Sequence, residues 1–321
     1  MLSNPLLKFL ISNNLDVASY STLKGGRNSH VFLLSHCDGS NSVLKLYPCD
    51  SMWRLKREVQ FLQLLDQSQQ IPRLKLFSAE LNCSIISYIQ GEPVRNRIKA
   101  IESFVNFVSD INSKFKQDKE DYSSIINAQE AFLSISGLRE NLCARFETLK
   151  IDLKKLDSLQ TTSNKKIKVL LNEMFSSALD SLEMFESKLS RKDVFASNNL
   201  ILSPSDVGFH NMLQSSLIYY FIDFEYAGLD HPTKLFCDFI LQPDSSLSVQ
   251  EARLMLGCVD NMDYYSGLIN VDHVIAMLPV YRFKWAVIIV NRMMRQVNWQ
   301  NQSMEYIYNF AETTQNTISN L

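Results

Sequence analysis

SPSDVGFHN (203–211) and IDFEYAG (222–228) are the two stretches that decide the fold. In the first, Asp206 and Asn211 lie five residues apart in a segment rich in turn-forming residues. In the second, Asp223 ends a run of apolar residues, a pattern that predicts a short strand delivering its carboxylate to a fixed place. Transfer of a phosphoryl group to a hydroxyl needs a carboxylate beside the acceptor and oxygen ligands for Mg²⁺ beside the triphosphate. These three side chains could supply those groups, although each one alone is more typical of a polar turn or a helix cap.

A lysine and a glutamate upstream strengthen this interpretation. Lys45 lies within the β-type run 42–48, and Glu58 follows 13 residues later in the amphipathic helix that the spacing predicts over 51–67. Alone, the first is typical of a solvated lysine on a half-exposed strand and the second of a surface charge. Together they match the way a bilobal kinase fixes a cation against nucleotide phosphates, with a helix glutamate holding a strand lysine.

A glycine pair precedes the lysine by about 20 residues. The chain has only nine glycines in 321 residues, well under the usual share of about 7%, so the adjacent Gly25 and Gly26 stand out. The segment lacks the GxGxxG and Walker patterns, and a plain hairpin turn remains an equally good interpretation. As a phosphate-binding turn, the glycines would let backbone N–H groups approach phosphate oxygens, and Asn28 and Ser29 would add donors.

In these motifs the chain resembles the aminoglycoside phosphotransferase and choline kinase-like family, small-molecule kinases with a protein-kinase-like fold. The resemblance extends over nearly the whole chain. It implies that Asp206 is the base and that Asn211 and Asp223 bind Mg²⁺. It also implies that Lys45 contacts the phosphates of ATP or GTP, with Glu58 orienting the lysine.

Further residues near the motifs carry expectations from the same resemblance. Glu225 is a candidate metal ligand, or a residue that supports the ligands. Asp238 resembles the helix aspartate that anchors the family's catalytic loop. His210 has two interpretations apart from the resemblance: a structural hydrogen bond in the loop is favoured over catalysis, because a neighbouring carboxylate already serves as base. Members often have His-Gly before the catalytic aspartate, where this chain has Pro204-Ser205.

The order of elements predicts an α+β, bilobal, protein-kinase-like fold with a cleft between the lobes. β-type runs and turn signals predict a small N-terminal nucleotide-binding lobe over 1–89, with roughly five strands. A hinge is expected over 90–94. The helical C-terminal lobe, 95–321, would hold the catalytic loop, a hairpin and the acceptor site, with a polar connection at 160–166 between two long helices.

Composition excludes several other classes of function. Lys and Arg number 32 against 34 Asp and Glu, a net charge of −2, so no basic field exists to hold nucleic acid or an anionic membrane. The six cysteines include no CxxC pair, which argues against a zinc or redox site. We expect no apolar stretch of membrane-spanning length and no secretory leader, and therefore a cytoplasmic protein.

The expected partners are a nucleoside triphosphate and a small hydroxyl-bearing substrate: a sugar, sugar conjugate, amino alcohol or aminoglycoside-like molecule. Pro232 follows Asp223 by only nine positions, which leaves no long activation segment and disfavours a protein substrate. Arg282 and Lys284, in the apolar helix pattern 278–299, are candidates for binding a phosphate or carboxylate on the substrate. The alternative function is a catalytically silent kinase-like nucleotide-binding module, and the sequence indicates no oligomeric state.

Overall fold

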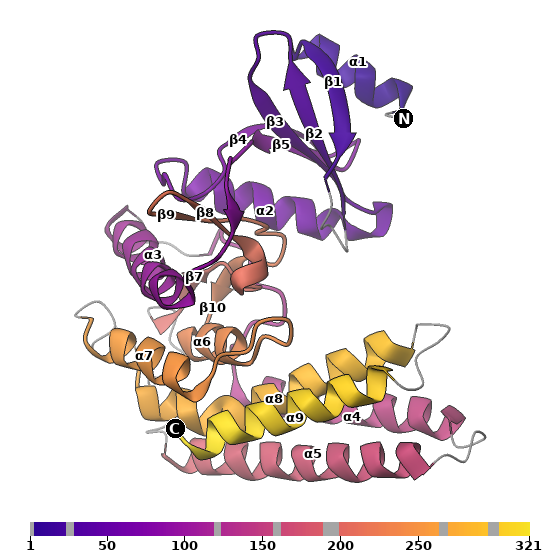
Figure 1. The fold of residues 1–321 in the computed structure, drawn as a ribbon, viewed down its shortest axis with the longest axis vertical. Coiled ribbons are helices and arrows are strands. Elements are labelled where there is room, and N and C mark those ends of the chain that lie inside the picture. Colours follow the sequence, from indigo (N-terminus) through magenta and orange to yellow (C-terminus); the bar gives the residue numbers. More distant parts are fainter. Residues whose placement is uncertain are drawn as a thin grey trace.

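The computed structural model describes residues 3–23, 29–118, 123–156, 162–188, 199–262, 269–294 and 302–321. It is an α+β structure, with an antiparallel sheet near the N-terminus and long helices in the C-terminal half (Figure 1). The N-terminal part contains α1 (Asn4–Ser12), β1 (Val17–Thr22), β2 (His30–His36), β3 (Asn41–Leu46), the 3-10 turn η1 (Cys49–Ser51), α2 (Met52–Leu64), β4 (Leu74–Ser78) and β5 (Cys83–Ser87).

The N-terminal sheet has five strands in the order β1-β2-β3-β5-β4, as the sequence predicted in number, and all neighbours are antiparallel. Its two faces are covered by different helices. Leu34 and Leu44 pack with Leu6 and Leu10 of α1 on one face, and Tyr47 packs with α2 on the other. Because side chains alternate along a strand, β3 presents Leu44 to α1 and Lys45 to the opposite face. Helix α1 is not among the elements that the sequence predicted.

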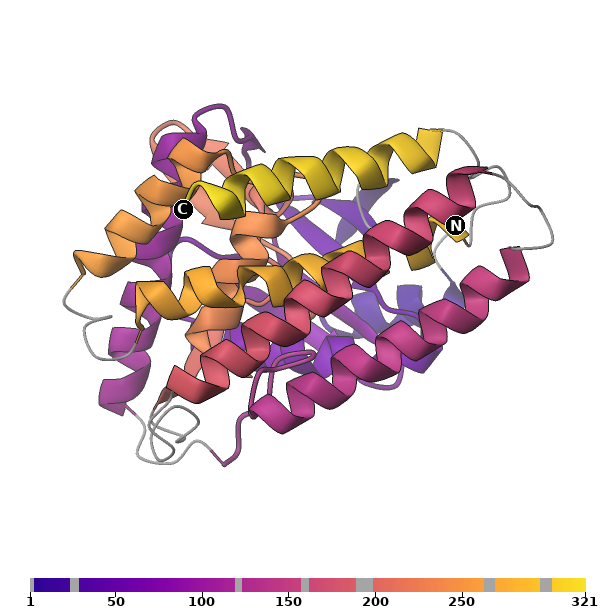
Figure 2. The same ribbon diagram turned by 90° about the horizontal axis from the view of Figure 1, so that it is seen from below.

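The remaining elements begin with a two-residue strand within the predicted hinge. They are β6 (Glu92–Pro93), α3 (Arg97–Asp118), α4 (Ile135–Leu156), α5 (Thr162–Lys188), β7 (Ile201–Ser203), the 3-10 turn η4 (Phe209–Asn211), β8 (Met212–Ser215), β9 (Ile218–Phe221), β10 (Gly228–Asp230), α6 (Pro232–Leu241), α7 (Val249–Asp260), α8 (Val271–Met294) and α9 (Gln302–Ser319). The polar connection predicted at 160–166 is in part wrong, since α5 already begins at Thr162. Seen from below, α4, α5, α8 and α9 form a layer of long helices (Figure 2).

Two small sheets frame the segment that carries the motifs. Strand β8 pairs with β9 in the predicted hairpin and with β6 on its other side. Strands β7 and β10 pair antiparallel, with Ser203 opposite Gly228. Because β7 runs into the first motif and β10 leaves the second, this pairing brings the two motifs side by side.

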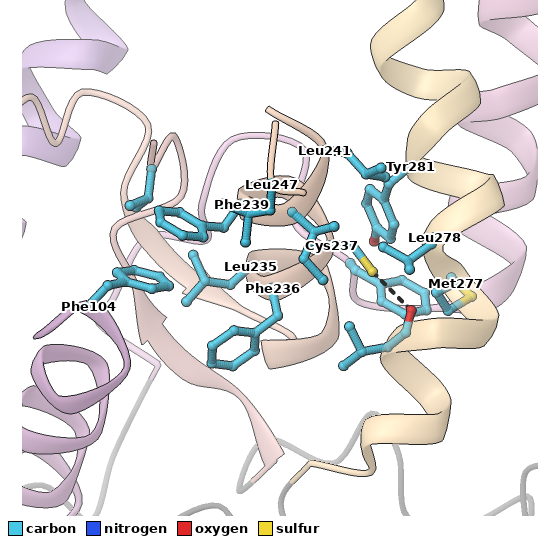
Figure 3. Close-up of a cluster of buried hydrophobic side chains, with 14 of the residues drawn as sticks. Phe104, Leu235, Phe236, Cys237, Phe239, Leu241, Leu247, Met277, Leu278 and Tyr281 are labelled. Carbon is cyan, nitrogen blue, oxygen red and sulfur yellow. Dashed lines mark hydrogen bonds between the residues drawn. The ribbon is translucent and has the colours of Figure 1, made fainter. Parts of the chain in front are cut away.

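Helix α6 lies in the centre of the large hydrophobic core, and all ten of its residues are buried. Phe104 of α3 stacks on Phe239 of α6 with ring centroids 4.5 Å apart. The ring centroids of Phe236, in an edge-to-face arrangement, and of Phe221, in a tilted one, lie 6.1 and 6.2 Å from that of Phe104. Tyr281 of α8 covers the opposite side of α6 (Figure 3). Charged residues on α6 are therefore held rigidly in an apolar setting.

Helix α8 corrects one expectation. By length and composition it could cross a membrane, with a mean hydropathy of 1.5 in its most apolar window, whereas the sequence was expected to hold no such stretch. Of that window 67% is buried inside the protein. Its apolar character is therefore that of a core helix packed against α5 and α6.

We predict that Phe104→Ala lowers the free energy of unfolding by about 3–5 kcal/mol, because it leaves a cavity where three aromatic rings meet. Chemical denaturation measures this. Val169→Ala, on the exposed side of α5, is the control and should change stability by no more than about 0.5 kcal/mol. Equal effects of the two substitutions would show that α6 does not depend on this aromatic contact.

Candidate active site

Lys45 is a buried cation at the centre of the site. Its Nζ lies 2.7 Å from Oε1 of Glu58 on α2, and both side chains are at most 6% exposed. Glu58 shares its helix face with Leu55, Val59 and Leu62, which are buried as well. The predicted pairing is thus present, and the solvated alternative for Lys45 is wrong.

Asp223 holds the same ammonium from the other side. Its Oδ1 lies 2.8 Å from Lys45 Nζ, while its side chain is 38% exposed. The residue follows β9 with a φ of +68°, and the preceding Ile222 donates its N–H to the carbonyl of Asn211. The segment is therefore fixed beside the loop of the first motif, with a carboxylate that still faces solvent.

The surrounding carboxylates keep the Lys45 ammonium protonated. Burial alone would lower the pKa of Lys45, but the carboxylates of Asp223, Glu58 and Glu225 outweigh it and raise that pKa above its ordinary value. Lys45 is thus a permanent cation in the range of physiological pH.

The loop of the first motif is anchored at its start and braced within. Asn112 of α3 donates to the carbonyl of Leu202 at 3.0 Å and accepts from its N–H at 2.7 Å. Within the loop, the side-chain amide of Asn211 donates to the backbone carbonyl of Asp206, five residues earlier, at 2.8 Å. The oxygen Oδ1 of Asn211 accepts no hydrogen bond from the described residues. The amide oxygen of Asn211 and the half-exposed carboxylate of Asp223, one oxygen of which bonds Lys45, could therefore serve as metal ligands.

The Asp206 carboxylate is half-buried and receives a long hydrogen bond, 3.4 Å, from Gln242 Nε2. Burial raises the pKa of Asp206, the charges of Asp223 and Asp238 act in the same direction, and His210 and Lys284 oppose them. A carboxyl group with a raised pKa is a better proton acceptor than an ordinary surface aspartate.

Pro204-Ser205 replaces the His-Gly pair common in the family, but the backbone at Ser205 still has a conformation typical of glycine. Ser205 has a φ of +65°, in the left-handed region that favours glycine, the residue that family members often have there. Its N–H donates to Ser203 Oγ at 3.1 Å, and Lys234 Nζ lies 3.5 Å from its hydroxyl. Local hydrogen bonds thus stabilise a conformation that glycine would adopt without them.

Lys234 belongs to a row of four buried charges beneath the loop. It bonds Asp230 at 2.8 Å and Asp238 at 3.3 Å, and Asp238 in turn accepts from Lys284 at 2.7 and 3.0 Å. Burial opposes ionisation of Asp238, but the two ammonium groups outweigh it and lower its pKa. Asp238 is therefore linked to the loop of the first motif through Lys234, a residue that the sequence analysis missed.

Arg282 and Lys284, the two residues predicted to bind an anionic group of the substrate, are both bonded to other parts of the protein. Arg282 is buried and donates to Thr314 Oγ1 at 3.0 Å and to the carbonyl of Ala311 at 2.7 Å, so its predicted role as an anion ligand is wrong. Lys284 pairs with Asp238, as described above. Helical periodicity placed both residues correctly on α8 but did not reveal which face is buried.

The remaining residues of the predicted site are those of the glycine-pair segment and Glu225. Gly25, Gly26 and Asn28 lie outside the described residues, and Ser29 is buried. Glu225 is buried and forms an ion pair with Arg54 of α2.

The side chain of His210, in the same loop, differs from the expectation. It forms no hydrogen bond with another described residue, whereas a structural hydrogen bond was expected. A Cβ at Gly208 would lie 2.7 Å from its Nδ1, so its ring packs over that glycine.

Neither a protein-family model nor a curated protein sequence matches the chain. Solved structures do match over almost its full length. They include choline kinase LicA from Streptococcus pneumoniae (TM-score 0.61, 16% identity, 99% of each chain) and the streptomycin–ATP complex of APH(2")-IIa (TM-score 0.59, 15% identity, 99% of each chain). The chain has the fold of these small-molecule kinases. A third match is the GDP and kanamycin complex of APH(2")-IIia, with a TM-score of 0.62, 13% identity and coverage of 97% of this chain and 99% of the other.

We predict that Lys45→Met lowers the free energy of unfolding by about 3–5 kcal/mol, because Glu58 is then a buried charge without its cation. Adding Glu58→Gln should restore a large part of that loss, since both charges are then absent. Thermal or chemical denaturation of the two single variants and the double variant measures the coupling. Strictly additive losses would show that the two side chains act independently.

Proposed function

We propose that the protein is an ATP- or GTP-dependent phosphotransferase that phosphorylates a hydroxyl group of a small molecule. The observation that carries the proposal is the arrangement around Lys45. A buried ammonium bonds a helix glutamate and a half-exposed aspartate at 2.7 and 2.8 Å, and the aspartate is hydrogen-bonded through its neighbour to the loop that holds Asp206 and Asn211. Phosphoryl transfer depends on such fixed positions more than on covalent chemistry by the protein.

The donor set suits Mg²⁺, which prefers hard oxygen ligands and retains part of its water shell. Asn211 would offer an amide oxygen and Asp223 a carboxylate that is 38% exposed. Bound there with a nucleotide, the ion would neutralise charge on the phosphate oxygens. Lys45 would contact the phosphates on the opposite side, and Glu58 would keep the lysine in place.

Asp206 would accept the proton of the acceptor hydroxyl and orient its oxygen toward the γ-phosphorus. The new bond forms between that oxygen and phosphorus, the bond from phosphorus to the β,γ-bridging oxygen breaks, and the nucleoside diphosphate departs. The raised pKa of the Asp206 carboxyl supports this role, because it favours holding the transferred proton.

A small acceptor is favoured by two observations. The segment between Asp223 and Pro232 contains the short strand β10 and no long loop that could bind a polypeptide. The matched structures include a choline kinase and complexes with streptomycin or kanamycin, which are small hydroxyl-bearing molecules, as choline is. The six free cysteines suit a reducing compartment such as the cytoplasm.

We predict that Asp206→Asn leaves nucleotide binding intact but lowers turnover by about 10²- to 10⁴-fold, because the amide cannot accept the proton. Consumption of ATP and GTP with Mg²⁺ is measured over a panel of choline, ethanolamine, kanamycin and hexoses. Binding is followed by the rise in melting temperature with nucleotide. Asp223→Asn is the matched comparison and should weaken metal-dependent binding as well.

The outcomes separate the two candidate functions. Undiminished transfer by Asp206→Asn would contradict the proposed base. Binding of nucleotide by the unaltered protein without transfer to any acceptor would favour the catalytically silent module. No stabilisation by either nucleotide, with or without Mg²⁺, would contradict both.

A further inference from the structure

Residues 124–129, here called the connecting segment, lie between α3 and α4 and are bonded to helix α2. The side-chain amide of Gln60 on α2 donates from Nε2 to the carbonyl of Ser124 at 2.8 Å and accepts the N–H of Ile126 at Oε1, also at 2.8 Å. Because one partner is an acceptor and the other a donor, both bonds form in only one orientation of the amide. Three residues earlier on the helix, Arg57 donates from Nε to the carbonyl of Asn127 at 3.2 Å.

The backbone of the connecting segment also bonds the end of the second motif and the strand that follows it. The N–H of Leu229 donates to the carbonyl of Ile126 at 3.0 Å, and the N–H of Ala128 donates to the carbonyl of Leu229 at 2.8 Å. The N–H of Gln129 donates to the carbonyl of Tyr226 at 3.0 Å. The connecting segment therefore joins α2 to the part of the chain that carries the candidate metal ligand of the second motif.

Gly228, the last residue of the second motif, makes this close contact possible. A Cβ at this position would lie 2.3 Å from the carbonyl oxygen of Ile126 and 2.5 Å from the backbone nitrogen of Ala128. Both distances are too short for atoms that are not bonded to each other, so only glycine allows the two backbones to approach this closely. The contact is therefore built into the sequence of the motif.

Helix α2 is consequently held on two neighbouring faces. On one face, Glu58 accepts the N–H of Phe224 at 3.3 Å, and Phe61 stacks on the ring of Phe224 with centroids 4.5 Å apart. Residues three apart on a helix share a face, so the two side chains that bond the connecting segment form the adjacent face. Contacts on both faces oppose a rotation of α2 about its axis, which would move Glu58 away from Lys45.

We propose that Gln60 is a positioning residue, which bonds α2 to the connecting segment and so keeps Glu58 beside Lys45. The inference rests on the proposed function, in which this lysine and glutamate hold the phosphates of the nucleotide. A functional side chain keeps its position only if the residues around it are themselves fixed by packing and hydrogen bonds. Nucleotide affinity should therefore depend on Gln60, and it should do so through Glu58.

The test measures dissociation constants for MgATP and MgGTP by calorimetry at fixed Mg²⁺, with nucleotide titrated to millimolar concentration. Gln60→Met keeps the length of the side chain but removes both bonds, and it should weaken binding by about fivefold or more. Glu58→Gln should weaken binding as well. Adding Gln60→Met to Glu58→Gln should change affinity by no more than about twofold, because the group that Gln60 positions is then already absent.

Gln63→Met is the matched control. Gln63 is the same type of residue on the same helix, but its side chain is exposed. Its substitution should change nucleotide affinity by no more than about twofold. Melting temperatures without nucleotide show how much each substitution destabilises the fold. A residue that only stabilises the fold would lower the melting temperature of both backgrounds and leave the affinity of the folded protein unchanged.

Three results would overturn the inference: unchanged affinity of Gln60→Met, equal losses in Gln60→Met and Gln63→Met, or a loss in the double variant that is the product of the two single losses. If Gln60→Met does not fold, Gln60→Glu decides by the same criteria, since it keeps the acceptor for the N–H of Ile126 and loses the donor to Ser124. Failure of the unaltered protein to bind either nucleotide would instead overturn the proposed function, and this inference with it.

Discussion

The buried ammonium of Lys45 is the interaction on which the rest of the site depends. It joins a strand, a helix and a segment 178 residues further along the chain, through bonds of 2.7 and 2.8 Å to Glu58 and Asp223. A charge taken out of water is costly unless its partners are near, and removing one partner of a buried pair costs about 3–5 kcal/mol. These ion pairs therefore fix the position of the N-terminal sheet relative to the C-terminal motifs before any ligand binds.

A second set of charges stabilises the other half of the site by the same means. Asp230, Lys234, Asp238 and Lys284 alternate in sign through the apolar core around α6. Of these four charges, Lys234 also lies 3.5 Å from the hydroxyl of Ser205, whose φ of +65° lies in the left-handed region, directly before Asp206. Both halves thus use buried ion pairs to position the exposed or half-buried side chains of the candidate site, which suits the proposed phosphoryl transfer, a reaction that depends on position and electrostatics.

Many of the helices, strands and candidate site residues could be predicted from the sequence, because the spacing of apolar residues and the order of the elements along the chain can be read from it directly. Alternation around Lys45 and helical spacing around Glu58 predicted the strand and the helix, and the likeness to a bilobal kinase predicted that the two side chains pair. Arg282 was misassigned and Lys234 and Arg54 were missed, because the partner of a charged helix residue depends on which face the tertiary fold buries. Likewise the apolar composition of α8 does not distinguish a core helix from a spanning one until its neighbours are known.

The most direct test of the account is a crystal structure of the protein with Mg²⁺ and a non-hydrolysable ATP or GTP analogue. The account predicts a metal ion bound by oxygens of Asn211 and Asp223, and a phosphate oxygen within hydrogen-bond distance of Lys45 while the lysine keeps its bond to Glu58. Asp206 should face the γ-phosphate across a space large enough for a hydroxyl group. A nucleotide bound elsewhere, or a metal coordinated without Asp223, would contradict it.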